Sequence, residues 1–219
     1  MGKTAGRRVS GDGNAMRSIS IIATVLLASI PMAAGNMLDV GDVAVSQDNT
    51  SPNIHFAIMT AKGYVGFSVP KDWRVISIQS KPPVAAAVFL APNSADAGTP
   101  DSTNVAISLI QPGTDQGKSA LDRIGKRYEG DVEASSHSGW ECYSQSAHQK
   151  KTIYTILDAK KNVADVIVSV RVAWPHLPKN SASYDSDMKA VFESLLDTID
   201  GNLGSYPIKP GEVVRRPDK

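Results

Sequence analysis

Residues 163–173 read Val-Ala-Asp-Val-Ile-Val-Ser-Val-Arg-Val-Ala, and this stretch decides the fold class of the chain. From residue 166 onward, one face of an extended chain would carry valines, which are Val166, Val168, Val170 and Val172. The opposite face would mix polar and apolar side chains, which are Val163, Asp165, Ile167, Ser169 and Arg171. A period of two indicates a β-strand with one buried face. The stretch therefore predicts a half-buried strand in an antiparallel sheet.

Further strands surround this one along the chain. Residues 139–147 and 152–159 are β-prone, and the polar runs 149–151 and 160–162 predict turns that join all three strands into a meander. Upstream strands are expected at residues 55–60, 64–69, 73–78, 84–90 and 104–111. The first two are expected to form a hairpin in which Gly63 adopts a positive φ. The apolar run 84–90 predicts a central strand that is covered on both faces.

Two stretches have helical periodicity. Residues 119–129 place Ala120, Leu121, Ile124 and Tyr128 on one face, which predicts an amphipathic helix lying on a sheet. Residues 183–200 predict a longer helix, which Ser183 or Asp185 would cap and after which Gly201 would take the left-handed C′ position.

The ends of the chain are expected to lack regular structure. Residues 36–53 are polar and predict a flexible arm, and residues 201–219 contain Pro207, Pro210 and Pro217 and predict an irregular tail. Residues 54–200 would then form a single domain. The element order predicts an α+β fold, in which an antiparallel sheet of about six to eight strands is flanked by helices in α/β/α layers.

Residues 1–35 have the organisation of a leader with a cleavable signal peptide. Arg17 precedes an apolar run at 19–30, and Ala33-Ala34-Gly35 supplies small residues for cleavage after Ala34 or Gly35. The run is too interrupted for a spanning helix. Met1 and Met16 both remain possible starts, and Arg7-Arg8 leaves twin-arginine export open beside the general route. The expected location is the periplasm or the extracellular space.

Composition narrows the class of partner. Apolar residues make up 42% of the chain and charged residues 21%, with a net charge of +1, as in ordinary globular proteins. Basic residues are not concentrated in the exported part, so nucleic acid is not expected as a partner. Cys142 is the sole cysteine, which excludes an internal disulfide. Its place between β-prone residues predicts a buried thiol, with a reactive or dimer-forming thiol as the alternative.

The segment Tyr64-Val65-Gly66-Phe67-Ser68-Val69-Pro70-Lys71-Asp72-Trp73 resembles the opening of the Mog1/PsbP-like group. In many members of that group, a strand that ends in Phe-x-Val-Pro is followed by x-x-Trp. The later strands, the amphipathic helix and a final helix with Phe192-x-x-Leu195-Leu196 follow in the order of that group, over residues 55–200. The resemblance implies an exported binding or adaptor module, such as an immunity protein, that has no catalytic activity. This chain differs from the lipoprotein members because it lacks the lipidated cysteine.

Sequence motifs for catalysis or cofactor binding are absent. The chain has no Gly-x-Ser-x-Gly elbow, no glycine-rich phosphate loop and no paired metal ligands. No cofactor, metal or enzymatic activity is therefore expected. One enzymatic alternative remains, a distributed site that uses His137 or His148 with Asp131. A small-ligand carrier is a third reading, and it would need an apolar pocket between sheet and helix.

Aromatic residues at strand ends are the best candidates for partner contacts. Half-exposed rings anchor many protein interfaces. Residues 174–178, Trp-Pro-His-Leu-Pro, are apolar and conformationally restricted, which favours a contact loop. The predicted partner-binding residues are Trp140, Tyr143, Trp174, His176 and Leu177. The partner is expected to be another protein, either an exported toxin or an envelope component, and the oligomeric state stays open.

Overall fold

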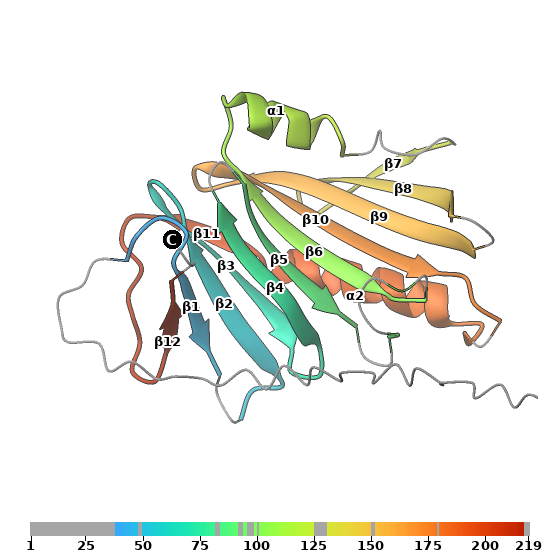
Figure 1. Cartoon of the computed structure of the whole chain (residues 1–219), viewed down its shortest axis with the longest axis horizontal. Helices are drawn as coiled ribbons and strands as arrows, with labels where there is room; N and C mark the ends of the chain where they lie inside the picture. Colours follow the sequence, from blue (N-terminus) through green and yellow to red (C-terminus); the bar gives the residue numbers. More distant parts are fainter. Residues whose placement is uncertain are drawn as a thin grey trace, which may run out of the picture.

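The computed structural model describes residues 38–47, 50–81, 84–91, 94–95, 99, 101–124, 131–149, 152–178 and 180–216. The predicted leader and signal peptide lie outside these residues. Within them the chain forms two antiparallel sheets and two helices, an α+β fold (Figure 1).

The smaller sheet has five strands and lies to the left in Figure 1. In spatial order these are β11 (Asp200–Leu203), β3 (Gly63–Pro70), β2 (Asn53–Met59), β1 (Val43–Ser46) and β12 (Val213–Arg215). The predicted hairpin is confirmed, because β2 and β3 pair directly, with Phe56 opposite Phe67.

The larger sheet has seven strands and fans out to the right in Figure 1. In spatial order these are β4 (Arg74–Lys81), β5 (Val84–Leu90), β6 (Asn104–Ile110), β10 (Val166–Pro175), β9 (Thr152–Val163), β8 (Trp140–Gln149) and β7 (Glu133–His137). The predicted meander is confirmed as β8, β9 and β10. The strand at 84–90 exists, but it lies beside the edge strand β4. Ala87, Phe89 and Leu90 are buried, while Ala85, Ala86 and Val88 are half-buried, so the strand is not covered on both faces along its length.

The core lies between one face of each sheet and helix α2 (Tyr184–Thr198). Phe89 of β5 meets Phe56 of β2 and Phe67 of β3, with ring centroids 5.6 and 6.2 Å apart. Valines from β10 and the apolar face of α2 complete the same cluster. The predicted α+β class with an antiparallel sheet of six to eight strands is confirmed, but the α/β/α layering is not, because a second sheet shares the inner layer with α2.

The turn between β9 and β10 differs from the predicted one. Residues 160–162 were expected to turn, but β9 continues to Val163 and the reversal occurs at Ala164, which has a φ of 52°. Lys160 and Lys161 project from opposite faces of β9, so long side chains with charged ends fit within a strand. Val163 and Asp165 consequently lie outside β10.

Gly63 is required by close approach and not by a positive φ, which it does not adopt. A Cβ atom there would lie 1.9 Å from the backbone oxygen of Asn202 in β11. Gly201 has a similar role, since its Cβ would lie 2.4 Å from Cγ1 of Val163. The predicted C′ role of Gly201 is wrong, because α2 ends at Thr198, Ile199 is extended and β11 begins at Asp200.

The two ends of the described chain pair with each other. β1 lies within the segment predicted as a flexible arm, and β12 lies within the predicted irregular tail. Their register places Ala44 opposite Val214. The expectation that both segments lack regular structure is wrong, because each strand finds its hydrogen-bond partners far away in the sequence.

Each helix has a polar residue at its N-cap, but only in α1 does the side chain of that residue accept a hydrogen bond from a free amide. Helix α1 (Asp115–Leu121) starts before the predicted residue 119, because the Thr114 hydroxyl accepts a hydrogen bond of 3.0 Å from the Gly117 amide. Residues 125–129 of the predicted helix lie outside the described residues. Ser183 occupies the N-cap of α2 without such a bond. Of the helices in the described part, none is long and apolar enough to cross a membrane.

Candidate functional site

The candidate site is the outer face of the seven-stranded sheet, which is the face turned away from α2. Strands β6, β10, β9 and β8 bury their other face in the core, so alternate side chains must point outward. The registers of these strands align the outward side chains in two adjacent rows. One row contains Ser108, Ser169, Lys160 and Glu141, and the other contains Arg171, Asp158 and Tyr143. The two rows therefore form a polar part of the outer face, which also carries the buried apolar residues Ile156 and Ala147.

Arg171 and Asp158 form a bidentate ion pair at the centre of the outer face. Arg171 Nε lies 2.6 Å from Asp158 Oδ1, and Nη2 lies 2.8 Å from Oδ2. The Asp158 side chain is 1% exposed, while the Arg171 side chain is 23% exposed. A buried carboxylate needs its charge compensated, and the planar guanidinium matches it with two parallel hydrogen bonds. The pair fixes the position of Arg171 at the surface.

Tyr143 and Lys160, which are half-buried, form a triad with the exposed Glu141 beside this pair. Lys160 Nζ lies 3.1 Å from Glu141 Oε2, and the Tyr143 hydroxyl donates to the same oxygen at 3.0 Å. Lys160 Nζ also lies 5.8 Å from the centre of the Tyr143 ring. The hydrogen bond from Lys160 lowers the pKa of Glu141, and the same bond raises the pKa of Lys160. Both groups therefore stay charged over a wide pH range.

Gln145 supplies a buried amide on the same face. It is 4% exposed, and neither its Nε2 nor its Oε1 has a hydrogen-bond partner. In the part of the chain that the structure describes, these are the buried side-chain polar atoms without a partner. Leaving such a group unpaired costs about 1–3 kcal/mol. An apolar residue would cost less here, so the amide is a candidate for a role other than stability.

Two of the predicted contact residues are core residues. Trp140 and Trp174 are each 1% exposed, and both pack on the face that α2 covers. The Trp174 indole donates a 2.7 Å hydrogen bond to Asp185 of α2. The prediction that their rings are half-exposed is wrong, because each sits at a strand end that the helix still covers. Neither indole is available to a partner in this conformation.

The remaining predicted contact residues lie on opposite faces of the sheet. Tyr143 belongs to the outer face. His176 lies beyond β10, and its Nε2 forms a 2.6 Å hydrogen bond with the hydroxyl of Thr155, which faces the α2 side. His176 is exposed and Leu177 is half-buried. The structure thus does not bring the five predicted residues together. The sequence indicated Tyr143 by its aromatic character, but Arg171, Asp158 and Gln145 become visible only when the strand register is known.

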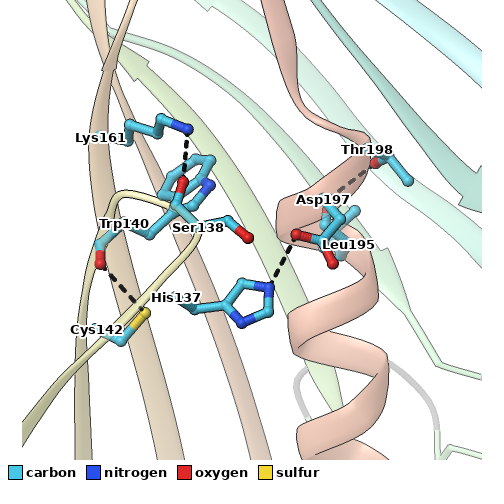
Figure 2. A network of polar contacts seen from close by, with 8 residues as sticks. All are labelled: His137, Ser138, Trp140, Cys142, Lys161, Leu195, Asp197 and Thr198. Atoms are coloured by element: carbon cyan, nitrogen blue, oxygen red, sulfur yellow. Dashed lines mark hydrogen bonds and ion pairs between the residues drawn. The ribbon is translucent and has the colours of Figure 1, made fainter.

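His137 pairs with a helix residue and not with Asp131. Its Nε2 lies 2.9 Å from Asp197 Oδ1, and Figure 2 shows the ring pointing from the β7–β8 hairpin toward α2. His148 lies near the other end of β8. Among the described residues no three His, Cys, Asp or Glu side chains are grouped to hold a metal ion. The groups proposed for a distributed catalytic site are therefore not assembled.

Cys142 points into the core from β8. It is 7% exposed and lies among the buried residues beneath α2, so the predicted buried thiol is confirmed. Burial raises the pKa of the thiol, which makes the reactive thiolate less accessible near neutral pH.

The described residues include one open pocket of about 460 Å³ that bears on the carrier hypothesis. Its walls include Met59, Lys62, Tyr206 and Ile208, which belong to the β2–β3 hairpin and the segment after β11. A carrier was expected to hold its ligand between sheet and helix. This pocket instead lies at the end of the five-stranded sheet, away from α2.

His55 is expected to make the fold less stable in mild acid. The half-buried ring lies 3.3 Å from the Ser68 hydroxyl, and burial lowers its pKa below 6.5 even though Asp200 acts in the opposite direction. The unfolded chain therefore takes up this proton first as the pH falls. The contribution of neutral His55 is present above pH 6.5 and is lost as the pH falls through the lowered pKa.

This expectation is tested by melting temperatures measured from about pH 8 to about pH 5, across the ordinary titration range of histidine. His55→Gln should show a smaller fall in melting temperature than the parent chain. His148→Gln, at an exposed position, is the matched control and should retain the parental fall. Equal falls in the parent and His55→Gln would contradict the assignment.

Comparisons with known proteins show distant structural likeness. The chain matches no protein-family model and no curated protein by sequence. A solved structure from Bacteroides thetaiotaomicron VPI-5482 is similar to 65% of the chain, with 16% identity and a TM-score of 0.41. The match covers 47% of that protein, so this chain spans less than half of its length. LpqN of Mycobacterium tuberculosis, described as involved in cell envelope biogenesis, is similar over 73% of this chain and 91% of its own, with 14% identity and a TM-score of 0.36. Neither description names the Mog1/PsbP-like group, and that resemblance stays a prediction.

Proposed function

We propose that this chain is an exported, non-enzymatic protein-binding module whose contact surface is the outer face of the seven-stranded sheet. The observation that carries the proposal is the two-row arrangement of Arg171, Asp158, Tyr143, Lys160 and Glu141 on adjacent strands. Tyrosine and arginine dominate the energetics of protein interfaces, especially where neighbouring groups hold them in place. Here Asp158 holds Arg171, and Glu141 holds Tyr143.

The unpartnered amide of Gln145 supports the same surface. A primary amide can both donate to and accept from a peptide group, and a partner would satisfy both buried atoms at once if binding displaced the residues that cover them. The cost of leaving the amide unpaired in the free protein would then be recovered on binding. This is the behaviour expected of a group that is present for recognition.

The segment at residues 17–35 supports a location outside the cytoplasm, and the partner is accordingly an exported or envelope protein. An immunity protein that blocks an exported toxin and an envelope adaptor both fit this description. Genomic neighbours separate them, because a toxin gene beside this one favours immunity and an operon for envelope assembly favours an adaptor.

The proposal is tested by capture of partners from an envelope extract on the immobilised exported chain. Double replacement Tyr143→Ala with Lys160→Ala removes the aromatic anchor and its cationic neighbour from the outer face. We expect this variant to retain a specific partner at least about tenfold less well than the parent. Quantitative mass spectrometry of the eluates measures the difference.

Lys189→Ala provides the matched control, because Lys189 is exposed on α2 on the other side of the sheet. Its retention of the partner should equal that of the parent. Melting temperatures establish that both variants are folded. Equal retention by the outer-face variant and the control, or no protein retained by the parent, would contradict the proposal.

A further inference from the structure

Strand β7 is an open edge of the seven-stranded sheet. It pairs with β8 on one side, and the sheet order places no described strand on the other. Residues 133–136 are exposed and His137 is half-buried. An edge of this kind presents unpaired backbone N–H and C=O groups to another extended chain.

The other edge of this sheet is protected, whereas β7 is not. Strand β4 carries Arg74 and Lys81 and has a register shift between Val75 and Ser77, features that discourage further pairing. Strand β7 reads Glu-Ala-Ser-Ser-His and contains no proline, lysine or bulge. Its three central side chains are small, which lets a second backbone approach closely.

The β7–β8 turn determines which backbone groups of β7 face outward. Ser138 and Gly139 have φ values of 49° and 81°, as in a two-residue type I′ hairpin turn. In such a hairpin the flanking residues, here His137 and Trp140, form a hydrogen-bonded pair. Bonding alternates along an antiparallel ladder, so the amides and carbonyls of Ala134 and Ser136 point away from β8.

We propose that β7 pairs with β7 of a second copy of this chain, antiparallel and centred on Ser135. This register places Ala134 opposite Ser136 of the second copy, and both residues have outward-facing backbone groups. The two symmetric pairs supply four hydrogen bonds across the edge. The interface is isologous, as expected for a two-fold dimer.

Charge complementarity selects a second copy as the occupant. The same register places Glu133 of each copy opposite His137 of the other, on one face of the joined sheet. Glu133 of each copy thus faces an imidazole whose Nε2 is already bonded to Asp197 of its own chain, and no pair of like charges arises along β7. A one-residue slip would lose this match and would set outward-facing backbone groups against residues that are bonded to β8.

The pairing would join the two seven-stranded sheets into one. The two-fold axis of such an antiparallel pair is perpendicular to the sheet, so both outer faces would lie on the same side. Two copies of the Tyr143 region would then form one continuous surface. The dimer itself does not rest on the proposed function. Association of two copies is measured on this chain alone, and partner capture is measured in a separate experiment.

Site-directed cross-linking tests the register. In a central non-hydrogen-bonded pair the Cα atoms are about 4.5 Å apart, which lies within the range of a disulfide. Ser135→Cys should therefore yield a disulfide-linked dimer on mild oxidation. Glu133→Cys is the matched control, because the two introduced thiols would be four residues apart in register and should not cross-link. Cross-linking of both variants, or of neither, would overturn the proposed pairing.

Sedimentation equilibrium over a series of concentrations tests the association without cross-linking. The weight-average mass of the parent exported chain should rise from one chain toward two. Ser136→Pro removes an outward-facing donor and should keep the mass at one chain, while Ser136→Thr keeps the donor and should behave as the parent. A parent mass that stays at one chain at every concentration would overturn the proposal, and the cysteine variants decide the matter if the proline variant does not fold.

Discussion

Replacing Phe89 with alanine is expected to lower the free energy of unfolding by about 3–5 kcal/mol. Phe89 is fully buried and joins the two sheets, since its ring contacts Phe56, Phe67 and Trp73. The ring centroids of Phe89 and Trp73 are 6.3 Å apart. Rigid strands surround the site on both sides, so the cavity left by the ring cannot collapse easily.

Chemical denaturation of parent and variant gives the loss directly from the shift in midpoint. Val88→Ala is the matched control, because Val88 is half-buried and points from the same strand to the outer face. Val88→Ala should lower the free energy of unfolding clearly less than Phe89→Ala does. A loss below about 1 kcal/mol for Phe89→Ala would mean that the two sheets do not share the core described above.

Replacing Asp158 with alanine is expected to cost about 3–5 kcal/mol, the other large effect. The carboxylate is almost fully buried, and its removal leaves the Arg171 guanidinium without its bidentate partner on the sheet. The loss arises because the guanidinium keeps its charge after losing the carboxylate that accepts two of its hydrogen bonds. Most of the penalty should therefore disappear when Arg171 is also replaced by a residue of similar length.

The double replacement Asp158→Ala with Arg171→Met tests this reasoning. Its free energy of unfolding should lie closer to that of the parent than the single variant does. If the loss of unfolding free energy in the double variant equals the sum of the losses in Asp158→Ala and Arg171→Met, the two groups act independently. In the binding assay the double variant should still fail, because the outer face loses its central charges.

Local pattern was sufficient for the elements that bury a regular apolar face. The alternation around Val168, the hairpin at β2 and β3 and the periodicity of α2 each recur over enough residues to identify a strand or helix. The burial of Cys142 followed for the same reason, since it continues such a pattern in β8.

Elements with little apolar character escaped prediction. β7 contains mostly small polar residues, and β11 contains Asp200 and Gly201, so neither has a buried face that would identify it. β1 and β12 are short and pair across most of the length of the chain. Their stability comes from the neighbouring strand, and that information is not local.

The stretch 163–173 by itself determined that this protein has a half-buried β-strand in an antiparallel meander, because a period of two leaves one face for the core. Tertiary structure alone decided that a second sheet shares the core with α2 and that Trp140 and Trp174 are covered. It also decided that Arg171, Asp158 and Tyr143 lie side by side, since strand register, which depends on contacts between distant segments, sets which outward side chains become neighbours.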